Sequence, residues 1–180
     1  LKGTGKNYRK IHVKGVSFDS RKVKKKDIFF AINGIKTSGN KFIAEVISKG
    51  ASVIVSDKKI KIRGKKIPFL FTKDVRKSLS EASSNFYKKK PKNIIAVTGT
   101  NGKSSVVDFF YQILNLNKKL AASIGTLGII SQKYIKKTNL TSVDSLTLHN
   151  SLEILKKKKI NNVILEASCH GLDQNRLDNL

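Results

Sequence analysis

Residues 94–105, IIAVTGTNGKSS, constrain the fold more than any other stretch of the chain. An apolar run typical of a buried strand leads into a turn with two glycines, and an amphipathic segment follows that turn. Gly99 and Gly102 permit a chain reversal that points several backbone N–H groups inward, and the following helix presents the positive end of its dipole to the same place. The stretch therefore predicts a strand–loop–helix unit that cradles phosphate groups.

Two side chains strengthen this interpretation. Lys103 adds a positive charge for the outer phosphates, and the hydroxyl of Ser104 can reach a magnesium ion. The general phosphate-loop pattern, G-x-x-x-x-G-K-[ST], requires a glycine where this chain has Val97. Gly-Lys-Ser alone fits an ordinary basic turn, but the strand, the double-glycine turn and the helix together favour a nucleotide site.

The seven residues T-G-T-N-G-K-S resemble the ATP loop of the Mur ligases, the ATP-dependent enzymes that add amino acids to the peptidoglycan precursor. This resemblance implies that ATP and Mg²⁺ are the cofactors. It also implies that the ATP-binding residues are Gly99, Thr100, Asn101, Gly102, Lys103, Ser104 and Ser105.

The composition is that of a globular protein. The 180 residues are 39% hydrophobic, which suffices for one or two domains, and they contain no apolar run of about 18 residues that would span a membrane. The net charge of +25 comes from 37 basic and 12 acidic residues. Only five of the basic residues are arginines. Because arginines and aromatic residues do not interleave with the lysines, a solvated lysine surface is favoured over a groove for nucleic acid.

The chain ends and the single cysteine add three expectations. The first residues, LKGTGKNYRK, lack both a methionine and the apolar stretch of a secretory signal, so we expect a piece of a longer protein. Cys169 cannot form an internal disulfide, which fits a reducing cytoplasm. We expect a cytoplasmic monomer with no specific nucleic acid and no membrane as partner.

The part before the loop reads as a small mixed α/β domain over residues 1–90, with residues 88–93, KKKPKN, as its exit linker. Short strands are expected at residues 15–18, 27–32, 52–56 and 68–72. One helix shows an apolar face formed by Phe42, Ile43, Val46 and Ile47. A second helix, with Asp74 as its cap, has apolar residues at helical spacing, namely Val75, Leu79, Ala82 and Phe86.

Two polar interruptions in this domain are residues 18–21, FDSR, and residues 34–39, GIKTSG. Asp, Ser and Gly are common turn formers, so plain strand-ending turns are one interpretation. The wider stretch, residues 19–55, resembles the N-terminal domain of the Mur ligases that make the UDP-N-acetylmuramoyl tripeptide. That resemblance implies a pocket for the UDP end of the substrate, lined by Phe18, Ser20, Ile35, Lys36 and Thr37.

The second half, residues 91–180, predicts the first part of a P-loop ATPase-like parallel-sheet domain. After the loop, a helix with a buried stripe is expected from Val106, Phe110, Ile113 and Leu114, and residues 120–125 read as the next strand. Residues 128–135 are expected to form a short excursion of the chain away from the strand–helix pattern, before Thr138. A later helix is marked by Leu148, Leu152 and Leu155, capped by Asp144 or Thr141, and residues 162–167 read as a buried strand.

The segment T-S-V-D, residues 141–144, precedes that later helix, near the strand ends where open parallel sheets bind ligands. Taken alone, it is a capping segment without chemistry. The matching Mur ligase segment usually reads Thr-Thr-Pro-Asp and contacts the muramoyl-peptide substrate, which implies substrate contacts for Thr141 and Ser142. Ser142 keeps a hydroxyl, whereas Val143 in place of proline loosens the turn.

The polar run EASCHGLDQNR, residues 166–176, follows the last strand. A carboxylate at a strand end beside a phosphate loop suits Mg²⁺, and a solvated strand terminus is the alternative. The run matches the family pattern E-x-S-S-H-G-L-x-x-x-R almost throughout. By that resemblance Glu166 is the metal carboxylate, and the substrate contacts are Ser168, Gln174 and Arg176.

Cys169 and His170 do not predict a catalytic thiol or a zinc site. Neighbouring residues on a strand point to opposite faces, and the sequence offers no second pair of ligands. We expect His170 to shape the site through hydrogen bonding.

The resemblance runs through four motifs in collinear order. It implies an ATP-dependent ligase of peptidoglycan precursor synthesis that adds a third amino acid, meso-diaminopimelate or L-lysine, to UDP-N-acetylmuramoyl-L-alanyl-D-glutamate through an acyl phosphate. The catalytic residues are then Lys103 and Glu166, and the metal ligands are Ser104 and Glu166. The substrates, the UDP-linked dipeptide and an amino acid, are its expected partners.

Further family segments, including the C-terminal domain that selects the amino acid, lie beyond Leu180 in this resemblance. We therefore expect residues 1–180 alone to show weak or absent ligase activity in a phosphate-release assay. A folylpolyglutamate synthetase, which would lack the D-S-R domain, is one alternative. A basic module that binds nucleic acid is another, and a DNA or RNA complex that persists at physiological salt would favour it.

Overall fold

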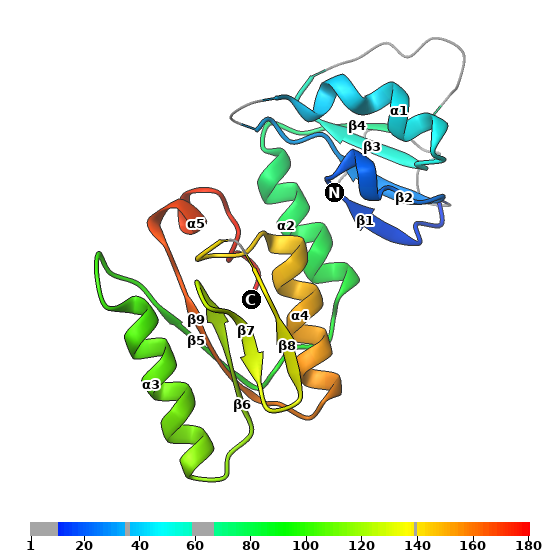
Figure 1. The fold of residues 1–180 in the computed structure, drawn as a ribbon. Helices are drawn as coiled ribbons and strands as arrows, with labels where there is room; N and C mark the ends of the chain where they lie inside the picture. Colours follow the sequence, from blue (N-terminus) through cyan, green and yellow to red (C-terminus); the bar gives the residue numbers. More distant parts are fainter. Residues whose placement is uncertain (1–10, 35–36, 59–66, 139) are drawn as a thin grey trace. The chain divides into compact units, whose positions relative to one another are not determined.

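The chain folds as two compact units, residues 1–82 and 83–180, each built around its own sheet (Figure 1). The computed structural model describes residues 11–34, 37–58, 67–138 and 140–180. Helices and strands alternate along both units, which confirms the predicted α/β fold class. No helix within the described ranges is long and apolar enough to cross a membrane.

The first unit has a four-stranded parallel sheet in the order β1-β2-β3-β4. Its strands are β1 (Gly15–Ser17), β2 (Asp27–Phe30), β3 (Val53–Ser56) and β4 (Phe69–Phe71), each within two residues of the predicted range. The short 3-10 helices η2 (Ser20–Lys22) and η3 (Gly39–Phe42) follow β1 and β2. The α-helices are α1 (Ile43–Ser48), which continues from η3, and α2 (Val75–Phe86), whose last four residues belong to the second unit.

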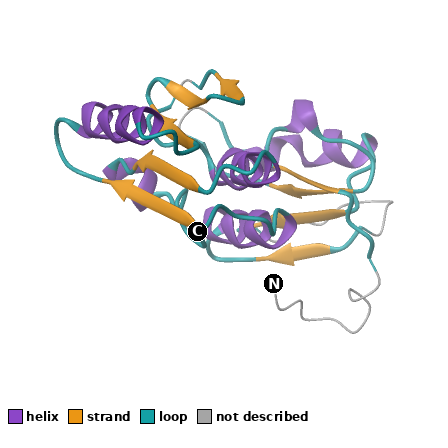
Figure 2. Ribbon diagram, turned by 90° about the horizontal axis from the view of Figure 1, so that it is seen from below, coloured by secondary structure: helices purple, strands orange, loops and turns teal. Residues whose placement is uncertain are grey.

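The strands β2 and β3 carry apolar side chains on both faces, as parallel strands covered by helices do. One core joins Phe29 and Ile54 to three residues of α1, namely Ile43, Val46 and Ile47. The other core joins the alternate residues of the same strands to Val75 and Leu79 of α2. The two helices therefore cover opposite faces of the sheet, and Figure 2 shows helices and strands in a second view.

The apolar stripe of α2 is shorter than predicted. Val75 and Leu79 are buried, and the carboxylate of Asp74 caps the helix by accepting a hydrogen bond from the Lys77 amide at 2.9 Å. Phe86 is 40% exposed, so the prediction that it joins the buried face is wrong. It is the last residue of α2, and its ring packs edge-on against the ring of Tyr87, with 5.1 Å between centroids.

The second unit has a five-stranded sheet in the order β5-β9-β6-β7-β8. Its strands are β5 (Asn93–Val97), β6 (Ala121–Gly125), β7 (Gly128–Ser131), β8 (Tyr134–Lys136) and β9 (Asn162–Glu166). The first three in this order pair in parallel, as predicted. The expected excursion is an antiparallel hairpin of β7 and β8 that extends the sheet beyond β6.

Three helices belong to the second unit: α3 (Lys103–Leu116), α4 (Ser145–Lys157) and α5 (Cys169–Asp173). The predicted leucines of α4 are fully buried against β6 and β9, in the larger core of this unit. Asp144, not Thr141, caps α4, because its carboxylate accepts a hydrogen bond from the Thr147 amide at 2.8 Å.

The predicted buried stripe of α3 is wrong in part. Val106 and Ile113 are 51% and 56% exposed, and the residue of α3 buried most deeply is Val107, at 3%. Helix α3 carries apolar residues around most of its circumference, so periodicity alone does not select the buried face. The contact of α3 with β6 and β9 selects it. β5 forms the edge of the sheet, with Ile95 exposed.

We expect the stability of the chain to fall as the pH drops from about 6.5 towards 4. His149 on α4 is fully buried, with its Nε2 3.2 Å from the carbonyl oxygen of Asp178. Burial, and then the charge of Lys90, lower the pKa of His149 from 6.5 to about 4. Within that window the unfolded chain binds a proton that the folded chain excludes, so the free energy of unfolding rises with pH.

Urea unfolding at several pH values across this window measures the slope. His149→Gln should flatten it, whereas His170→Gln, which changes an exposed histidine, serves as the matched control. Equal slopes in the wild type and His149→Gln would contradict the assignment.

Candidate functional site

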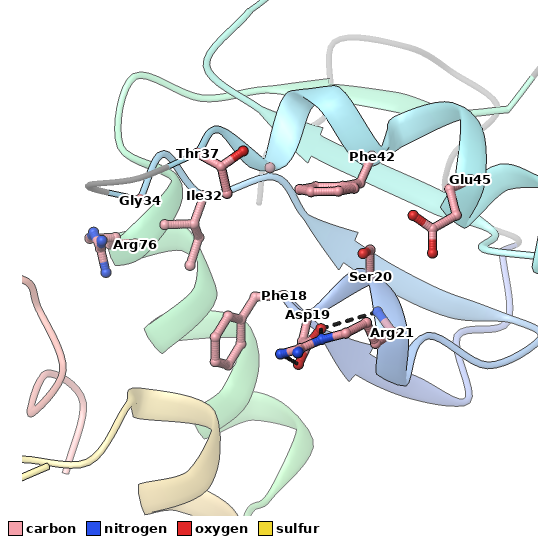
Figure 3. A pocket seen from close by; sticks show the side chains of 11 residues that line it. Phe18, Asp19, Ser20, Arg21, Ile32, Gly34, Thr37, Phe42, Glu45 and Arg76 are labelled. Carbon is pink, nitrogen blue, oxygen red and sulfur yellow. Dashed lines mark hydrogen bonds and ion pairs between the residues drawn. The ribbon is translucent and has the colours of Figure 1, made fainter. Parts of the chain in front are cut away.

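A cavity of about 630 Å³ lies in the first unit, beyond the carboxyl ends of β1 and β2 (Figure 3). Its lining comes from η2, the loop after β2, η3, α1 and the first turn of α2. The lining residues are Phe18, Asp19, Ser20, Arg21, Ile32, Gly34, Thr37, Gly39, Phe42, Glu45 and Arg76. Three of the predicted UDP contacts, Phe18, Ser20 and Thr37, are among them, while Ile35 and Lys36 lie outside the described residues.

The D-S-R turn forms one side of this cavity and is held by a bidentate ion pair. Arg21 donates from Nε to Oδ1 of Asp19 at 2.9 Å and from Nη2 to Oδ2 at 2.8 Å, as the dashed lines in Figure 3 mark. The Arg21 hydrogen bonds hold the pKa of the Asp19 carboxyl below its usual value. Because Asp19 also caps η2, Ser20 is placed in the first position of that helix, where it is buried.

The glycine loop on the other side is closed by one carboxylate. Asp57, just after β3, accepts a hydrogen bond from Asn33 Nδ2 at 2.6 Å and one from Asn40 Nδ2 at 3.2 Å. Asn33 and Asn40 flank the loop, so Asp57 ties its two ends together. Gly39 is required here, because a Cβ atom would lie 2.8 Å from the backbone of Ile32.

Several lining residues were not predicted from the sequence. Phe42 was assigned to a helix face, and Arg76 lies in the first turn of α2, far along the chain from the D-S-R turn. Arg76 Nη2 donates to the carbonyl oxygen of Asn33 at 3.3 Å, which places a second guanidinium at the cavity. The local sequence around Arg76 contains no motif, because only the packing of α2 on the sheet brings it there.

The predicted phosphate loop joins β5 to α3 in the second unit. Gly99 and Gly102 have φ angles of 147° and 78°, which only glycine adopts without strain. Gly102 is the N-cap of α3 and offers no side chain to the helix amides, so the first turn presents them to a ligand. The Lys103 ammonium donates to the carbonyl oxygens of Gly99, at 2.5 Å, and Thr100, at 3.2 Å, and so lies over the loop.

Glu166, at the end of β9, lies beside this loop. It is 3% exposed, and its Oε2 accepts a hydrogen bond from the Ser104 hydroxyl at 3.0 Å. Thr126 donates to the same carboxylate from its amide, at 2.9 Å to Oε1, and its Oγ1 lies 3.2 Å from Oε2. Both partners, Ser104 and Thr126, are neutral. A buried carboxylate and a hydroxyl thus lie together where the loop would hold phosphates.

The predicted substrate contacts of this unit form one hydrogen-bonded network. Ser142, which is buried, donates to the carbonyl oxygen of Glu166 at 2.9 Å and accepts from the Ser168 amide at 2.9 Å. Arg176 Nη1 donates to the carbonyl oxygen of Ser142 at 2.7 Å, while its Nε and Nη2 both donate to Gln174 Oε1. The Thr141 hydroxyl lies 3.1 Å from the Thr126 hydroxyl. The two clusters that are distant in sequence thus meet around Glu166.

Cys169 and His170 do not lie on a strand, so that prediction is wrong; both residues begin the short helix α5. Ser168 caps that helix, because its hydroxyl accepts a hydrogen bond from the Gly171 amide at 3.1 Å. Both Cys169 and His170 are exposed. Within the described part of the chain, no three His, Cys, Asp or Glu residues are grouped as ligands for a metal ion.

The arrangement in the second unit suits the binding of a nucleotide phosphate with a divalent cation. Loop amides and an ammonium would neutralise phosphate oxygens, while a serine hydroxyl and a carboxylate are the oxygen donors that Mg²⁺ prefers. The cavity of the first unit combines aromatic and apolar surface with hydroxyls and two guanidinium groups, which suits a nucleoside diphosphate.

Comparison with known proteins agrees with both halves of this description. The Mur ligase family catalytic domain matches residues 12–98, and the Mur ligase middle domain matches residues 97–180. A curated relative from Rickettsia conorii (strain ATCC VR-613 / Malish 7), named UDP-N-acetylmuramoyl-L-alanyl-D-glutamate–2,6-diaminopimelate ligase, is 46% identical over 174 residues, which are 94% of this chain and 36% of the relative. The protein of the same name from Bradyrhizobium diazoefficiens is 40% identical over 168 residues, covering 93% of this chain and 34% of the relative.

Two solved structures of Mur ligases are also similar to this chain. A UDP-N-acetylmuramoyl-L-alanyl-D-glutamate–2,6-diaminopimelate ligase has a TM-score of 0.78 at 30% identity, covering 93% of this chain and 34% of that one. The MurF ligase from Thermotoga maritima, solved with ADP, shares the fold, with a TM-score of 0.58 at 20% identity over 85% of this chain and 31% of that one.

The chain spans about a third of the length of the curated relatives it matches, 36% and 34% in the two cases above. Within that span, the two domain matches follow each other from residue 12 to residue 180 and overlap at residues 97–98, just before the phosphate loop in the sequence. The two relatives cover 94% and 93% of this chain at 46% and 40% identity. The chain therefore belongs to the Mur ligase family.

Proposed function

We propose that this chain supplies the UDP-binding and ATP-binding parts of a ligase that adds 2,6-diaminopimelate to UDP-N-acetylmuramoyl-L-alanyl-D-glutamate. The observation that carries the proposal is the Ser104–Glu166 pair, 3.0 Å apart beside the Gly-Lys-Ser loop. The names of the relatives favour diaminopimelate over lysine as the amino acid. The lone cysteine fits a cytoplasmic enzyme.

In this proposal, residues 91–180 bind ATP through the loop from Gly99 to Ser105. Mg²⁺ fits the residues present, because the Ser104 hydroxyl and Glu166 Oε2 are adjacent oxygen donors, and Ser104 and Thr126, which donate to this carboxylate, are uncharged. When bound, the cation would neutralise charge on the phosphates. Ser104 and Glu166 would hold it.

The proposed reaction has two steps. A carboxylate oxygen of the D-glutamyl residue takes the γ-phosphoryl group of ATP and ADP leaves, giving an acyl phosphate. The amino group of the incoming amino acid then attacks the acyl carbon, phosphate leaves, and the amide forms. Lys103 and the loop amides would stabilise charge on the phosphoryl group in transfer.

The substrate would be aligned by the network around Glu166. Ser142, Ser168, Gln174 and Arg176 are hydrogen-bonded to one another and Thr141 is hydrogen-bonded to Thr126, so their positions are set before a substrate arrives. Residues 1–90 would bind the UDP end, with the uracil beside Phe18 and the diphosphate near Ser20 and Thr37. Arg76 would add positive charge there, whereas the charge of Arg21 is balanced by Asp19.

We expect Ser20→Ala to weaken the binding of UDP by about threefold to tenfold, because one hydrogen bond to the ligand is lost. Isothermal titration of the chain with UDP measures the change. Ser52→Ala, which changes a serine just before β3 that is not among the lining residues, is the matched control and should bind UDP as the wild type does. Equal affinities in all three proteins would refute the assignment of this cavity to UDP.

We expect Lys103→Met to weaken the binding of ATP by about tenfold or more, because a charge-assisted contact to phosphate is removed. Fluorescence titration with a labelled ATP analogue measures the dissociation constant. The control is Lys133→Met, which removes the same charge from the exposed turn between β7 and β8. A loss of the same size in both variants would point to general charge attraction and against a phosphate loop.

A further inference from the structure

We propose that Thr126, together with Gly125, is a positioning residue that orients the Glu166 carboxylate. This inference rests on the metal role proposed for Glu166. Thr126 belongs to no motif singled out in the sequence, and it lies at the point where the chain leaves β6.

Thr126 contacts the two carboxylate oxygens of Glu166 through two different groups, its amide and its hydroxyl. Its amide donates to Oε1 at 2.9 Å, and its hydroxyl oxygen lies 3.2 Å from Oε2. Ser104 donates to Oε2 as well, at 3.0 Å. The amide thus fixes Oε1 on the side of β6 and leaves Oε2 as the oxygen that faces the phosphate loop.

Gly125 makes this arrangement possible by its lack of a side chain. A Cβ atom on Gly125 would lie 2.1 Å from Glu166 Oε1 and 2.6 Å from its Cδ, so a side chain at this position would force the carboxylate to move. The carboxylate therefore packs directly against the backbone of β6. The bare backbone of Gly125 and the amide and hydroxyl of Thr126 together hold the Glu166 side chain in its observed orientation.

The direction of the hydrogen bonds follows from the chemistry of the groups. An ionised carboxylate only accepts, so the Thr126 hydroxyl gives its single proton to Oε2. The contact between the Thr126 and Thr141 hydroxyls, at 3.1 Å, also has Thr126 as its donor, so the two acceptors compete for one proton and the anionic carboxylate is the stronger acceptor. The Thr126 hydroxyl therefore lies within hydrogen-bonding distance of both the proposed substrate segment, at Thr141, and the proposed metal ligand, Glu166.

Holding the carboxylate in place should strengthen metal binding, since partners that orient a ligand typically change metal affinity by about 10- to 100-fold. Thr126→Val keeps the shape and the amide but removes the hydroxyl, and Thr126→Ser restores the hydroxyl. The test measures the affinity of Mn²⁺ for the chain with ADP by electron paramagnetic resonance. ADP binding in the presence of EDTA is measured in parallel by titration.

We expect Thr126→Val to weaken Mn²⁺ binding by about tenfold or more while metal-free ADP binding stays unchanged. Thr126→Ser should return to within about threefold of the wild type, since the serine hydroxyl can reach the same oxygen. Glu166→Gln is the reference variant that should lose the metal-dependent part of binding. A purely structural defect would instead lower metal-free ADP binding in Thr126→Val.

The outcomes separate the two levels of the proposal. If Glu166→Gln weakens Mn²⁺ binding and Thr126→Val does not, the positioning role is overturned and the proposed function stands. If the wild-type chain with ADP binds no Mn²⁺, the metal role of Glu166 fails, and the positioning role fails with it. A loss in Thr126→Val that Thr126→Ser does not restore also overturns the role of the hydroxyl.

Discussion

The parallel pairing of β9 between β5 and β6 is the constraint on which the second unit depends. Val97 pairs with Glu166 across β5 and β9, and the Ala167 amide donates to the Val97 carbonyl oxygen at 2.8 Å. On the other side of β9, Ile124 pairs with Leu165. The phosphate loop, the Glu166 carboxylate and the Gly125–Thr126 turn therefore lie together at the carboxyl ends of these strands, because strands in parallel register end together.

Small residues let the polar groups at these strand ends approach one another. Gly125 accommodates the Glu166 carboxylate, and a Cβ atom on Gly171 would lie 2.5 Å from the Ser142 Cβ. Ser142 and Ser168 bring their hydroxyl oxygens to 3.0 Å across this gap. The result is a network in which the groups that would contact the substrate also fix the backbone next to the carboxylate. The first unit uses a related device, since Asp57 joins both ends of its glycine loop.

Much of the architecture was predictable because periodicity and turn chemistry are local. The strands of the first unit, the alternation of helices and strands, and the caps at Asp74 and Asp144 follow from residues close together in the chain. The buried face of α3 was not predictable, since Val106 and Val107 are adjacent, equally apolar, and 51% and 3% exposed. Only the docking of the helix on β6 and β9 distinguishes them. Phe86 was misplaced for a related reason, because a residue at a helix end can turn towards a sequence neighbour.

The sequence by itself determined the fold class, the family resemblance and the chemical groups at each site. These follow from residues whose meaning is local, such as the glycines and the lysine of residues 99–103 and the carboxylate at position 166. Only the tertiary structure decided that Arg76 lines the cavity of the first unit and that Thr126 holds both oxygens of Glu166. Contacts between residues far apart in the chain depend on strand order and helix docking, which no short stretch of sequence encodes.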